Sequence, residues 1–386
     1  MASAQHDFTT TGPGTLAGRY LRLFWQPVFL LERIRPGQAK PIRIMSEDYT
    51  LYRGATGDPY LIAFRCAHRG AQLSIGMVEG EEIRCRFHGW KFAGDGRCVD
   101  QPAELEQQFC GKVRVRHWPI RVYQGLVFAY LGEGDPPPFP TYPEVEGDGD
   151  IEPICYRRNC NFFNSIDNLF DESHVTYTHP IGFARVPEMP RITYKRGEAD
   201  AALYSERPGR GVRVRHFLMP NVLKLKVPTD DPEVFWMDYV NWRVPIDDGA
   251  HDTFAIQYVN VTGDMRERYA ARRQRLRSLP VPPTDDLAVA TLRGDTTLEE
   301  AEASMGEVDP NFKIFLEDHV TQIGQGIVAD RSAEWLGSAD VGVRLLRELW
   351  LEQLDRLAGG QLPNYAAPLL DVRIASGDRS DFATAP

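Results

Sequence analysis

The 386-residue chain lacks any excess of positive charge, because its 54 acidic residues outnumber its 44 lysines and arginines and give a net charge of -10. Such a chain repels phosphate backbones, so we expect no nucleic-acid partner. It also lacks an apolar run near the roughly 18 residues that cross a bilayer, and its first residues contain no apolar signal core. We therefore expect no membrane partner and a cytoplasmic location.

Cysteine is scarce as well, since six cysteines in a chain of this length do not make a disulfide framework and leave a metal or redox role to be considered first. The sequence has no flavin or dinucleotide fingerprint and no plant-type ferredoxin run of cysteines, which argues against a self-contained reductase. A hydrophobic fraction of 42% and a charged fraction of 25% are ordinary for a folded protein, and the length favours two or three domains.

Two short arms each combine one cysteine with one histidine, namely Cys66-Ala67-His68 and Cys85-Arg86-Phe87-His88. A Rieske [2Fe-2S] cluster has one iron held by two thiolates and the other held by two imidazoles. The pattern therefore predicts Cys66 and Cys85 on one iron and His68 and His88 on the other. The alternative is a structural zinc, which usually takes two cysteines followed by two histidines.

The surroundings of these arms favour tight loops between short strands. Gly70 and Gly89 follow the two histidines, where a ligand loop needs a residue that can take positive φ. The pattern predicts a small antiparallel sandwich, followed by a proline-rich linker from Gly132 to Asp150. Its expected strands are Tyr60 to Arg65, Ile83 to Cys85 and Gly125 to Leu131. The remaining cysteines are expected to be small buried hydrophobes: Cys98, Cys110, Cys155 and Cys160.

A second cluster of titratable groups lies in DNLFDESHVTYTH, from Asp167 to His179. On one helix Asp167, Asp171 and His174 would share a face, whereas His179 would point about 140° away from His174. We therefore expect the helix to end between the histidines, so that His179 folds back toward His174. Two imidazoles with a carboxylate from elsewhere form the binding face of mononuclear iron(II) oxygenases. The alternative is a partly solvated helix end that carries two ordinary histidines.

Together, these motifs resemble the terminal oxygenase (alpha) component of the Rieske non-haem iron aromatic-ring-hydroxylating oxygenases. Within that family the chain looks most similar to the group that includes phthalate dioxygenase, vanillate and dehydrodivanillate O-demethylases and carbazole dioxygenase. The resemblance covers most of the chain. It is carried by CAHRGAQLSIGMVEGEEIRCRFHGWKFAGDGRCVDQPAE, by the Asp-x3-Asp-x2-His-x4-His pattern, and by YLGEGDPPP and FLMPNVLKL.

The resemblance implies an α+β fold. Residues 1-150 would form an antiparallel β-sandwich Rieske domain, and residues 151-386 a helix-grip catalytic domain in which helices pack on an antiparallel sheet. The implied cofactors are a [2Fe-2S] Rieske cluster and a mononuclear Fe(II). The pattern of β-branched and apolar residues predicts catalytic-domain strands over 211-227, 234-244 and 253-262, a solvated basic helix over 266-277 and a packing helix over 341-357.

The third iron ligand must come from the C-terminal part of the chain, where Asp309-Pro310 is a typical helix start. The resemblance assigns Asp318, because an Asp, a Gln four residues later and a Gly eight residues later match the family segment at Asp318, Gln322 and Gly326. Glu317 is the alternative ligand. The chain departs from the family at Ile323, where many members have Glu.

Asp171 has a different role by resemblance. In family members the matching Asp connects a Rieske histidine of one subunit to an iron-ligand histidine of the next, which here would be His88 of a neighbouring copy and His174. A cyclic homotrimer follows from that arrangement.

The implied activity is hydroxylation or dihydroxylation of an aromatic substrate with dioxygen. Electrons would come from a separate NAD(P)H-dependent reductase. That reductase would either contain a flavin and a ferredoxin-type centre or pass its electrons through a ferredoxin. Oxidative O- or N-demethylation of an aromatic or quaternary-amine substrate is the alternative, and a Rieske electron-transfer protein without oxygenase activity is the rival from a different class. Each of three arginines could pair with a substrate carboxylate: Arg185, Arg191 and Arg243.

Overall fold

The structure, a computed structural model, describes residues 6–105, 108–179, 189–208, 211–229, 231, 234 and 236–374. It divides into two compact units. One contains Thr10–Pro140 with Val244–Asp247, and the other contains Thr141–Arg243 and Asp248–Pro386 together with the N-terminal residues up to Thr9. The boundary that we place at residue 150 between two functional domains stays a prediction.

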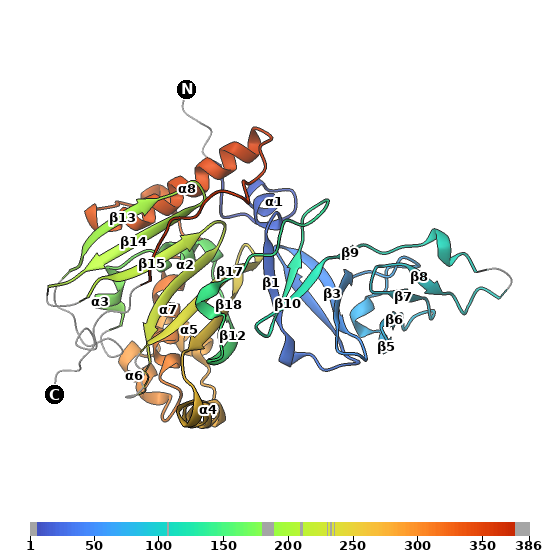
Figure 1. Ribbon diagram of the computed structural model, residues 1–386, viewed down its shortest axis with the longest axis horizontal. Helices are drawn as coiled ribbons and strands as arrows, with labels where there is room; N and C mark the ends of the chain where they lie inside the picture. Colours follow the sequence, from blue (N-terminus) through green and yellow to red (C-terminus); the bar gives the residue numbers. More distant parts are fainter. Residues whose placement is uncertain are drawn as a thin grey trace. The chain divides into compact units, whose positions relative to one another are not determined.

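Within its described residues the first unit contains the short α-helix α1, short 3-10 segments and three antiparallel sheets with the strand orders β1-β11-β10, β2-β3-β4-β9 and β5-β6-β7-β8 (Figure 1). The three strands expected from the sequence are present as β4, β6 and β11, each within two residues of its predicted ends. The elements are α1 (Leu16–Arg22), β1 (Trp25–Leu30), β2 (Ala39–Ile44), β3 (Glu47–Arg53), β4 (Pro59–Ala63), β5 (Met77–Glu79), β6 (Glu82–Arg84), β7 (Lys91–Ala93), β8 (Cys98–Asp100), β9 (His117–Trp118), β10 (Ile120–Tyr123) and β11 (Leu126–Tyr130).

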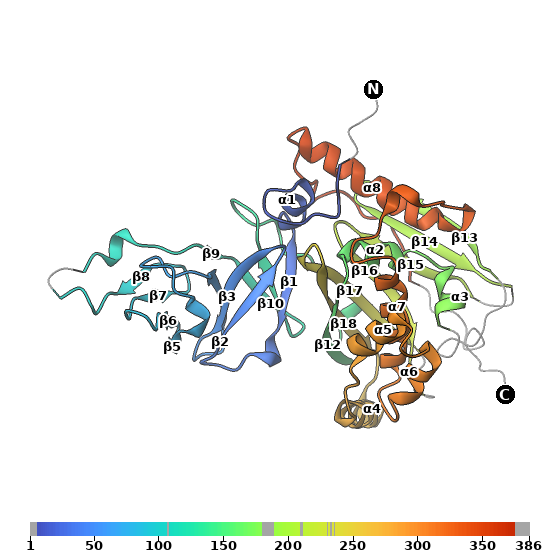
Figure 2. The ribbon, with the colours of Figure 1, turned by 180° about the vertical axis from the view of Figure 1, so that it is seen from behind.

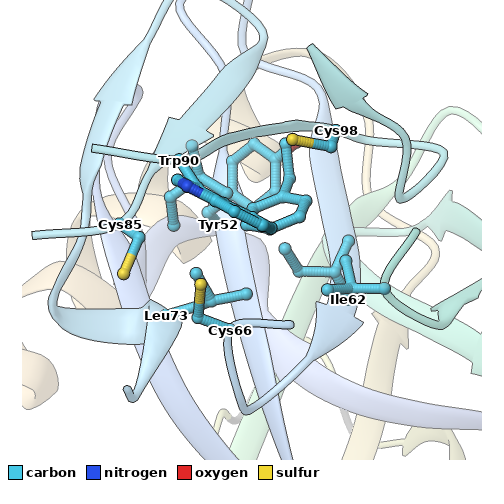
Figure 3. Packing of buried hydrophobic residues seen from close by; sticks show 10 residues of the cluster. Tyr52, Ile62, Cys66, Leu73, Cys85, Trp90 and Cys98 are labelled. Carbon is cyan, nitrogen blue, oxygen red and sulfur yellow. The ribbon is translucent and has the colours of Figure 1, made fainter. Parts of the chain in front are cut away.

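The core of this unit extends up to the two predicted ligand cysteines. Figure 3 shows Cys66 and Cys85 at the edge of a buried cluster that also contains Tyr52, Ile62 and Trp90. Because Cys66 and Cys85 are 3% and 2% exposed, the thiols are sheltered from water by this packing.

The second unit is built on a seven-stranded antiparallel sheet with the order β12-β18-β17-β16-β15-β14-β13 (Figure 2). The chain runs from β13 to β18 as a meander, and β12 lies beside β18. The strands are β12 (Asp150–Arg158), β13 (Arg191–Arg196), β14 (Asp200–Glu206), β15 (Arg213–Leu218), β16 (Val222–Pro228), β17 (Trp236–Asp247) and β18 (Ala250–Val259).

One strand prediction was wrong. Residues 211-227 do not form a single strand but split into β15 and β16, which pair with each other from Leu218 opposite Val222. Pro220 lies in the turn between them, and a proline without an N–H cannot continue a sheet ladder. The strands predicted over 234-244 and 253-262 are present as β17 and β18, with shifted ends.

The helices of this unit pack around the sheet and against one another, and α8 contacts both β14 and α2. The predicted packing helix is α8, whose buried residues include Leu346, Leu349, Trp350 and Leu354 at helical spacing. The predicted basic helix is α4, which has no buried residue, although Arg273 forms an ion pair with Asp150 of β12. The helices are α2 (Phe162–Leu169), α3 (His174–Thr178), α4 (Gly263–Ser278), α5 (Thr284–Arg293), α6 (Leu298–Ser304), α7 (Asn311–Gly324) and α8 (Val341–Ala358).

The predicted start of α7 is confirmed. Asp309 accepts a hydrogen bond from the backbone N–H of Asn311 at 2.9 Å, and Pro310 between them already has helical torsion angles. In the part of the chain that the structure describes, no helix is both long and apolar enough to span a membrane.

Candidate metal centres

The two Cys/His arms fold into loops of the same conformation. In each loop the cysteine N–H donates to the carbonyl oxygen five residues later, and the glycine N–H donates to the cysteine carbonyl, over distances of 2.8 to 3.0 Å. Gly70 and Gly89 have φ angles of 72° and 78°, as predicted. Each loop therefore reverses the chain within a few residues and presents one thiol and one imidazole.

The side chains of the two loops come together. The rings of His68 and His88 lie 4.5 Å apart between centroids, and His68 stacks on Trp90 at an interplanar angle of 7°. Nδ1 of His68 is buried and makes no hydrogen bond within the described residues. Burial raises the pKa of the Cys66 thiol to about 11. A buried imidazole nitrogen and a buried thiol are costly without a partner, so this donor set fits a cluster with two sulfur and two nitrogen ligands.

The helix predicted through Asp167, Asp171 and His174 was wrong, because α2 ends at Leu169 and α3 begins at His174. The guanidinium of Arg215 on β15 donates hydrogen bonds to the carbonyl oxygens of Leu169 and Asp171, at 3.0 and 2.8 Å. The carboxylate of Asp171 accepts from the backbone N–H of Ser173 at 2.7 Å. These bonds hold the segment between the helices in a turn.

The break gives Asp167 and His174 different surroundings. Asp167 forms ion pairs with Arg331 and with Arg347 of α8, at 2.9 and 2.7 Å. It stabilises the packing of the unit, and it is not part of the cluster formed by His174.

His174 and His179 converge, as predicted, because His179 directly follows the short helix α3 with non-helical torsion angles. Their ring centroids are 5.5 Å apart. Asp318 of α7 completes a group in which one ligand atom from each residue lies within 4.8 Å of the others. The Asp318 Oδ1 atom is 3.4 Å from Nε2 of His179 and 4.0 Å from Nε2 of His174.

Glu317, the alternative ligand, contacts the other nitrogen of the same ring. Its Oε2 lies 2.7 Å from Nδ1 of His179, and the carboxylate is 1% exposed. Consecutive helix residues point about 100° apart, so Glu317 and Asp318 can contact opposite edges of one imidazole. A carboxylate on Nδ1 fixes the ring so that Nε2 faces the cluster, as is common for metal-binding histidines.

The charges of the cluster follow from burial and from these contacts. Burial opposes a charge on Asp318, but the hydrogen bond with His179 and the nearby Arg158 guanidinium hold its pKa below the ordinary value. Burial also lowers the pKa of His174. Burial acts in the same direction on His179, yet its contacts with Asp318 and Glu317 raise its pKa to about 9. A metal ion would replace that proton on binding.

Two further side chains hold Asp318 in place. Arg158 of β12 donates to Oδ2 at 3.2 Å, and Asn168 of α2 donates to Oδ1 at 3.2 Å. Sequence reasoning missed both. Asn168 lies inside the motif and could have been noticed, whereas nothing in the sequence marks Arg158.

Asp171 lies at the edge of the cluster. Its Oδ2 is 3.8 Å from Nδ1 of His174, which is too far for a hydrogen bond. Within the described residues, that buried nitrogen makes no hydrogen bond.

Gln322 and Gly326 connect α7 to α2. Ser165 of α2 donates to the side chain of Gln322, and Asn164 donates to the carbonyl oxygen of Gly326 at 2.9 Å. These bonds fix the helix that carries Asp318 against the helix that precedes the histidines.

The remaining candidates fall outside the cluster. Arg185 lies outside the described residues, and Arg191 is exposed on β13. Arg243 is buried and donates to Asn241 at 2.8 Å. The expectation for the four other cysteines holds for Cys98 and Cys160, which are buried, but not for two that are only half-buried: Cys110 and Cys155.

The donor set fits iron(II). One imidazole nitrogen from α3, one from the residue that follows α3 and one carboxylate oxygen from α7 converge on one point. Two imidazoles and a carboxylate are the ligands of mononuclear non-haem iron sites that keep open positions.

Comparison with known proteins supports both centres. Residues 24–119 match the family model of the Rieske [2Fe-2S] domain. The 5,5'-dehydrodivanillate O-demethylase oxygenase subunit of Sphingobium sp. is 28% identical, over 94% of this chain and 82% of the relative. The phenoxybenzoate dioxygenase subunit alpha of Ectopseudomonas oleovorans is 29% identical, over 96% and 90%.

Solved structures share the fold. NdmA of Pseudomonas putida CBB5 matches with a TM-score of 0.64 and 20% identity, over 93% of this chain and 98% of that one. The oxygenase in the reduced complex of oxygenase and ferredoxin of carbazole 1,9a-dioxygenase matches with a TM-score of 0.60 and 20% identity, over 89% and 94%. The expected fold class is confirmed: antiparallel Rieske sheets precede a large antiparallel sheet with helices.

The fold and the two centres define a Rieske non-haem iron oxygenase, and the chain belongs to that family as an oxygenase (alpha) subunit. Within the family it is related to the oxygenase subunits of 5,5'-dehydrodivanillate O-demethylase and phthalate 4,5-dioxygenase. It shares its fold with the oxygenase of carbazole 1,9a-dioxygenase.

Proposed function

We propose that the chain is the terminal oxygenase that hydroxylates or dihydroxylates an aromatic substrate with dioxygen, using electrons from a separate NAD(P)H-dependent reductase. The observation that carries the proposal is the convergence of His174, His179 and Asp318 in a chain that also contains a Rieske domain. A protein that only carried electrons would have no use for this second group of ligands.

The roles of the residues follow from their donor atoms. Cys66 and Cys85 would hold one iron of the cluster and His68 and His88 the other, within residues 1–150. The Nε2 atoms of His174 and His179 and Oδ1 of Asp318 would hold the mononuclear iron, within residues 151–386. When bound, the cluster supplies electrons and the iron supplies the chemistry that activates dioxygen.

The protein's own groups would prepare this site. Glu317 keeps the ring of His179 oriented, and packing of the helices α2 and α7 keeps Asp318 near both histidines. Because the side chains of His174 and Asp318 are 14% and 16% exposed, the site is sheltered yet remains accessible to a small molecule.

Electron transfer would involve a neighbouring copy of the chain. One oxygen of Asp171 is occupied by the backbone of Ser173, while the other faces Nδ1 of His174 and the side chain is 23% exposed. That geometry leaves Asp171 able to accept a hydrogen bond from His88 of a neighbour, which supports a cyclic homotrimer.

The electron donor would be a ferredoxin or a ferredoxin-type reductase, since the carbazole dioxygenase oxygenase has been solved in complex with ferredoxin. Because NAD(P)H is the source of these electrons, the reaction would take place in the cytoplasm. An aromatic substrate would place the reaction in the breakdown of aromatic compounds.

Oxidative demethylation is the second candidate. It is favoured by the similarity to the dehydrodivanillate O-demethylase oxygenase subunit, and it would use the same iron on a methyl C–H bond.

The two reactions can be separated by product analysis. The purified protein, a surrogate reductase and NADH would be tested with aromatic acids, aryl ethers and nitrogen heterocycles under ¹⁸O₂. A ring product that carries ¹⁸O supports hydroxylation, whereas formaldehyde with a phenol or an amine supports demethylation. Oxygen uptake that none of these compounds stimulates, in protein with both sites loaded, would contradict the proposal.

A further inference from the structure

Two cysteines of the first unit lie next to each other, although neither is a proposed ligand. Cys98 begins β8 and Cys110 begins a 3-10 turn that ends at Lys112, and these two segments contact each other. The N–H of Cys98 donates to the carbonyl oxygen of Val113 at 3.1 Å, and the N–H of Val113 donates to the carbonyl oxygen of Cys110 at 3.0 Å. The two side chains pack in one cluster, where the thiols hydrogen-bond with each other.

The two thiols differ in their access to solvent. Cys98 is 5% exposed, and burial raises the pKa of its thiol to about 12. Cys110 is half-buried, so a small oxidant can reach its sulfur. An accessible cysteine beside a second cysteine is the arrangement in which a sulfenic acid condenses to a disulfide. Cys110 is therefore placed to react first and Cys98 to react second.

The pair is connected to the Rieske loops through two aromatic rings. Phe109 directly precedes Cys110 and packs edge-on against Trp90, with ring centroids 5.5 Å apart. Trp90 belongs to the same buried cluster as Cys98 and stacks on His68 (Figure 3). The position of the backbone at Cys110 therefore affects the packing of the ring that covers a proposed cluster ligand.

We propose that Cys98 and Cys110 form a reversible disulfide when a peroxide reaches Cys110, and that this bond holds Phe109 against Trp90 and so protects the Rieske cluster. The sulfur of Cys110 attacks one peroxide oxygen, the O–O bond breaks, and a sulfenic acid and water form. The sulfur of Cys98 then displaces a second water from the sulfenic acid. The two thiols lose two electrons in total, and hydrogen peroxide is reduced to two water molecules.

The oxidant can come from the protein's own reaction. A site that reduces dioxygen releases peroxide when electrons arrive without substrate, and in this respect alone the inference rests on the proposed function. The disulfide would close a short loop and restrict the chain when the unit opens. The oxidised protein should therefore lose its cluster absorbance on heating about tenfold more slowly than the dithiol form.

A single tryptic peptide tests whether the bond forms. Trypsin cuts after Arg97 and after Lys112, and the peptide of residues 98–112 contains both cysteines and no other. The purified protein with its cluster oxidised is treated with a small excess of hydrogen peroxide, blocked with N-ethylmaleimide in denaturant and digested. We expect this peptide to carry no maleimide and to be lighter by two hydrogen atoms than the dithiol. Dithiothreitol before blocking should restore two maleimides.

Cys110→Ser and Cys155→Ser form a matched pair of variants, because both replace a half-buried cysteine. Cys110→Ser should remove the slower loss of the cluster that follows peroxide treatment, whereas Cys155→Ser in β12 should keep it. Cys98→Ser should behave like Cys110→Ser. If the buried Cys98 does not tolerate serine, Cys110→Ser decides, since its side chain is partly exposed.

Three results would overturn the inference. The first is sulfinic or sulfonic acid at Cys110 while Cys98 remains a thiol. The second is two unreacted thiols after peroxide treatment, even where the cluster has been lost. The third is a disulfide that leaves the rate of cluster loss unchanged. Because the peroxide is added, none of these results depends on the mononuclear site, so a protein without that iron would contradict the proposed function and leave this test valid.

Discussion

The two metal centres of this protein are built in different ways. The proposed Rieske ligands lie on two loops that repeat one backbone conformation, each fixed by bonds within six consecutive residues and by a glycine of positive φ. The proposed iron ligands come from α3, from the residue after it and from α7. The acidic pair on α7 begins 138 residues after His179. The first centre depends on local turns, and the second depends on the packing of helices across the sheet. Damage to one should therefore leave the other intact.

The largest effect should come from removing a proposed iron ligand. His174→Ala and Asp318→Ala should each reduce substrate-dependent oxygen uptake to background, because the site loses one of its three donors. The visible spectrum of the Rieske cluster should remain unchanged. If Asp318→Ala kept its activity while Glu317→Ala lost it, the two acids would have been assigned to the wrong roles.

Asp171→Asn tests the proposed connection between the centres of neighbouring subunits. Both centres should stay loaded, since neither uses Asp171 as a ligand, but reoxidation of the reduced cluster in a single turnover should slow by orders of magnitude. More reductase should not restore the rate, because the block follows docking.

Mixed oligomers provide the control for that prediction. His88→Ala chains lack a competent cluster and His174→Ala chains lack the iron, yet co-assembled rings verified by two tags should recover part of the activity. Verified mixed rings without activity would place the electron path within one chain. A fully active protein that sediments as a monomer would also show that electrons pass within one chain.

Glu317→Gln should have a smaller effect. The amide cannot carry the negative charge that orients His179, so iron affinity should fall by about 10- to 100-fold while the ligands remain present. Asp167→Asn is the matched control, because Asp167 contacts two arginines away from the cluster. It should lower the free energy of unfolding by about 1–3 kcal/mol and leave iron affinity unchanged. Equal losses of iron in the two variants would argue against a specific role for Glu317.

The smallest effects concern the two glycines of the Rieske loops. Gly70→Ala should cost about 1 kcal/mol, because only the positive φ opposes the new side chain and no atom lies within 4 Å of it. Gly89→Ala should cost more, since its Cβ would lie 2.6 Å from Cγ of Pro102. Thermal loss of the cluster absorbance measures both variants. The iron centre should be unaffected, and equal costs would contradict the geometry of the second loop.

The contrast between the centres also explains what the sequence could predict. Loops fixed by local spacing and glycine could be predicted from the sequence, and so could the helices α7 and α8, whose ends and apolar residues follow simple patterns. The choice of Asp318 required a family resemblance, because the spacing of residues alone cannot identify which distant acid lies near the two histidines.

Features that depend on tertiary contacts were missed. The break between α2 and α3 depends on Arg215 from a distant strand. Its guanidinium donates to two carbonyl oxygens that would accept backbone N–H groups in a continuous helix. Arg158 and Glu317 gain their roles only when β12 and α7 come to lie beside the histidines. Local sequence patterns carry no information on such contacts.

The most direct test of the account is the amount of iron and acid-labile sulfide per chain, measured in the natural protein and in Asp318→Ala. A [2Fe-2S] cluster and a mononuclear site predict about three irons and two sulfides in the natural protein, and about two irons and two sulfides in the variant. About two irons and two sulfides in both proteins would contradict the second metal centre and, with it, the proposed oxygenase reaction.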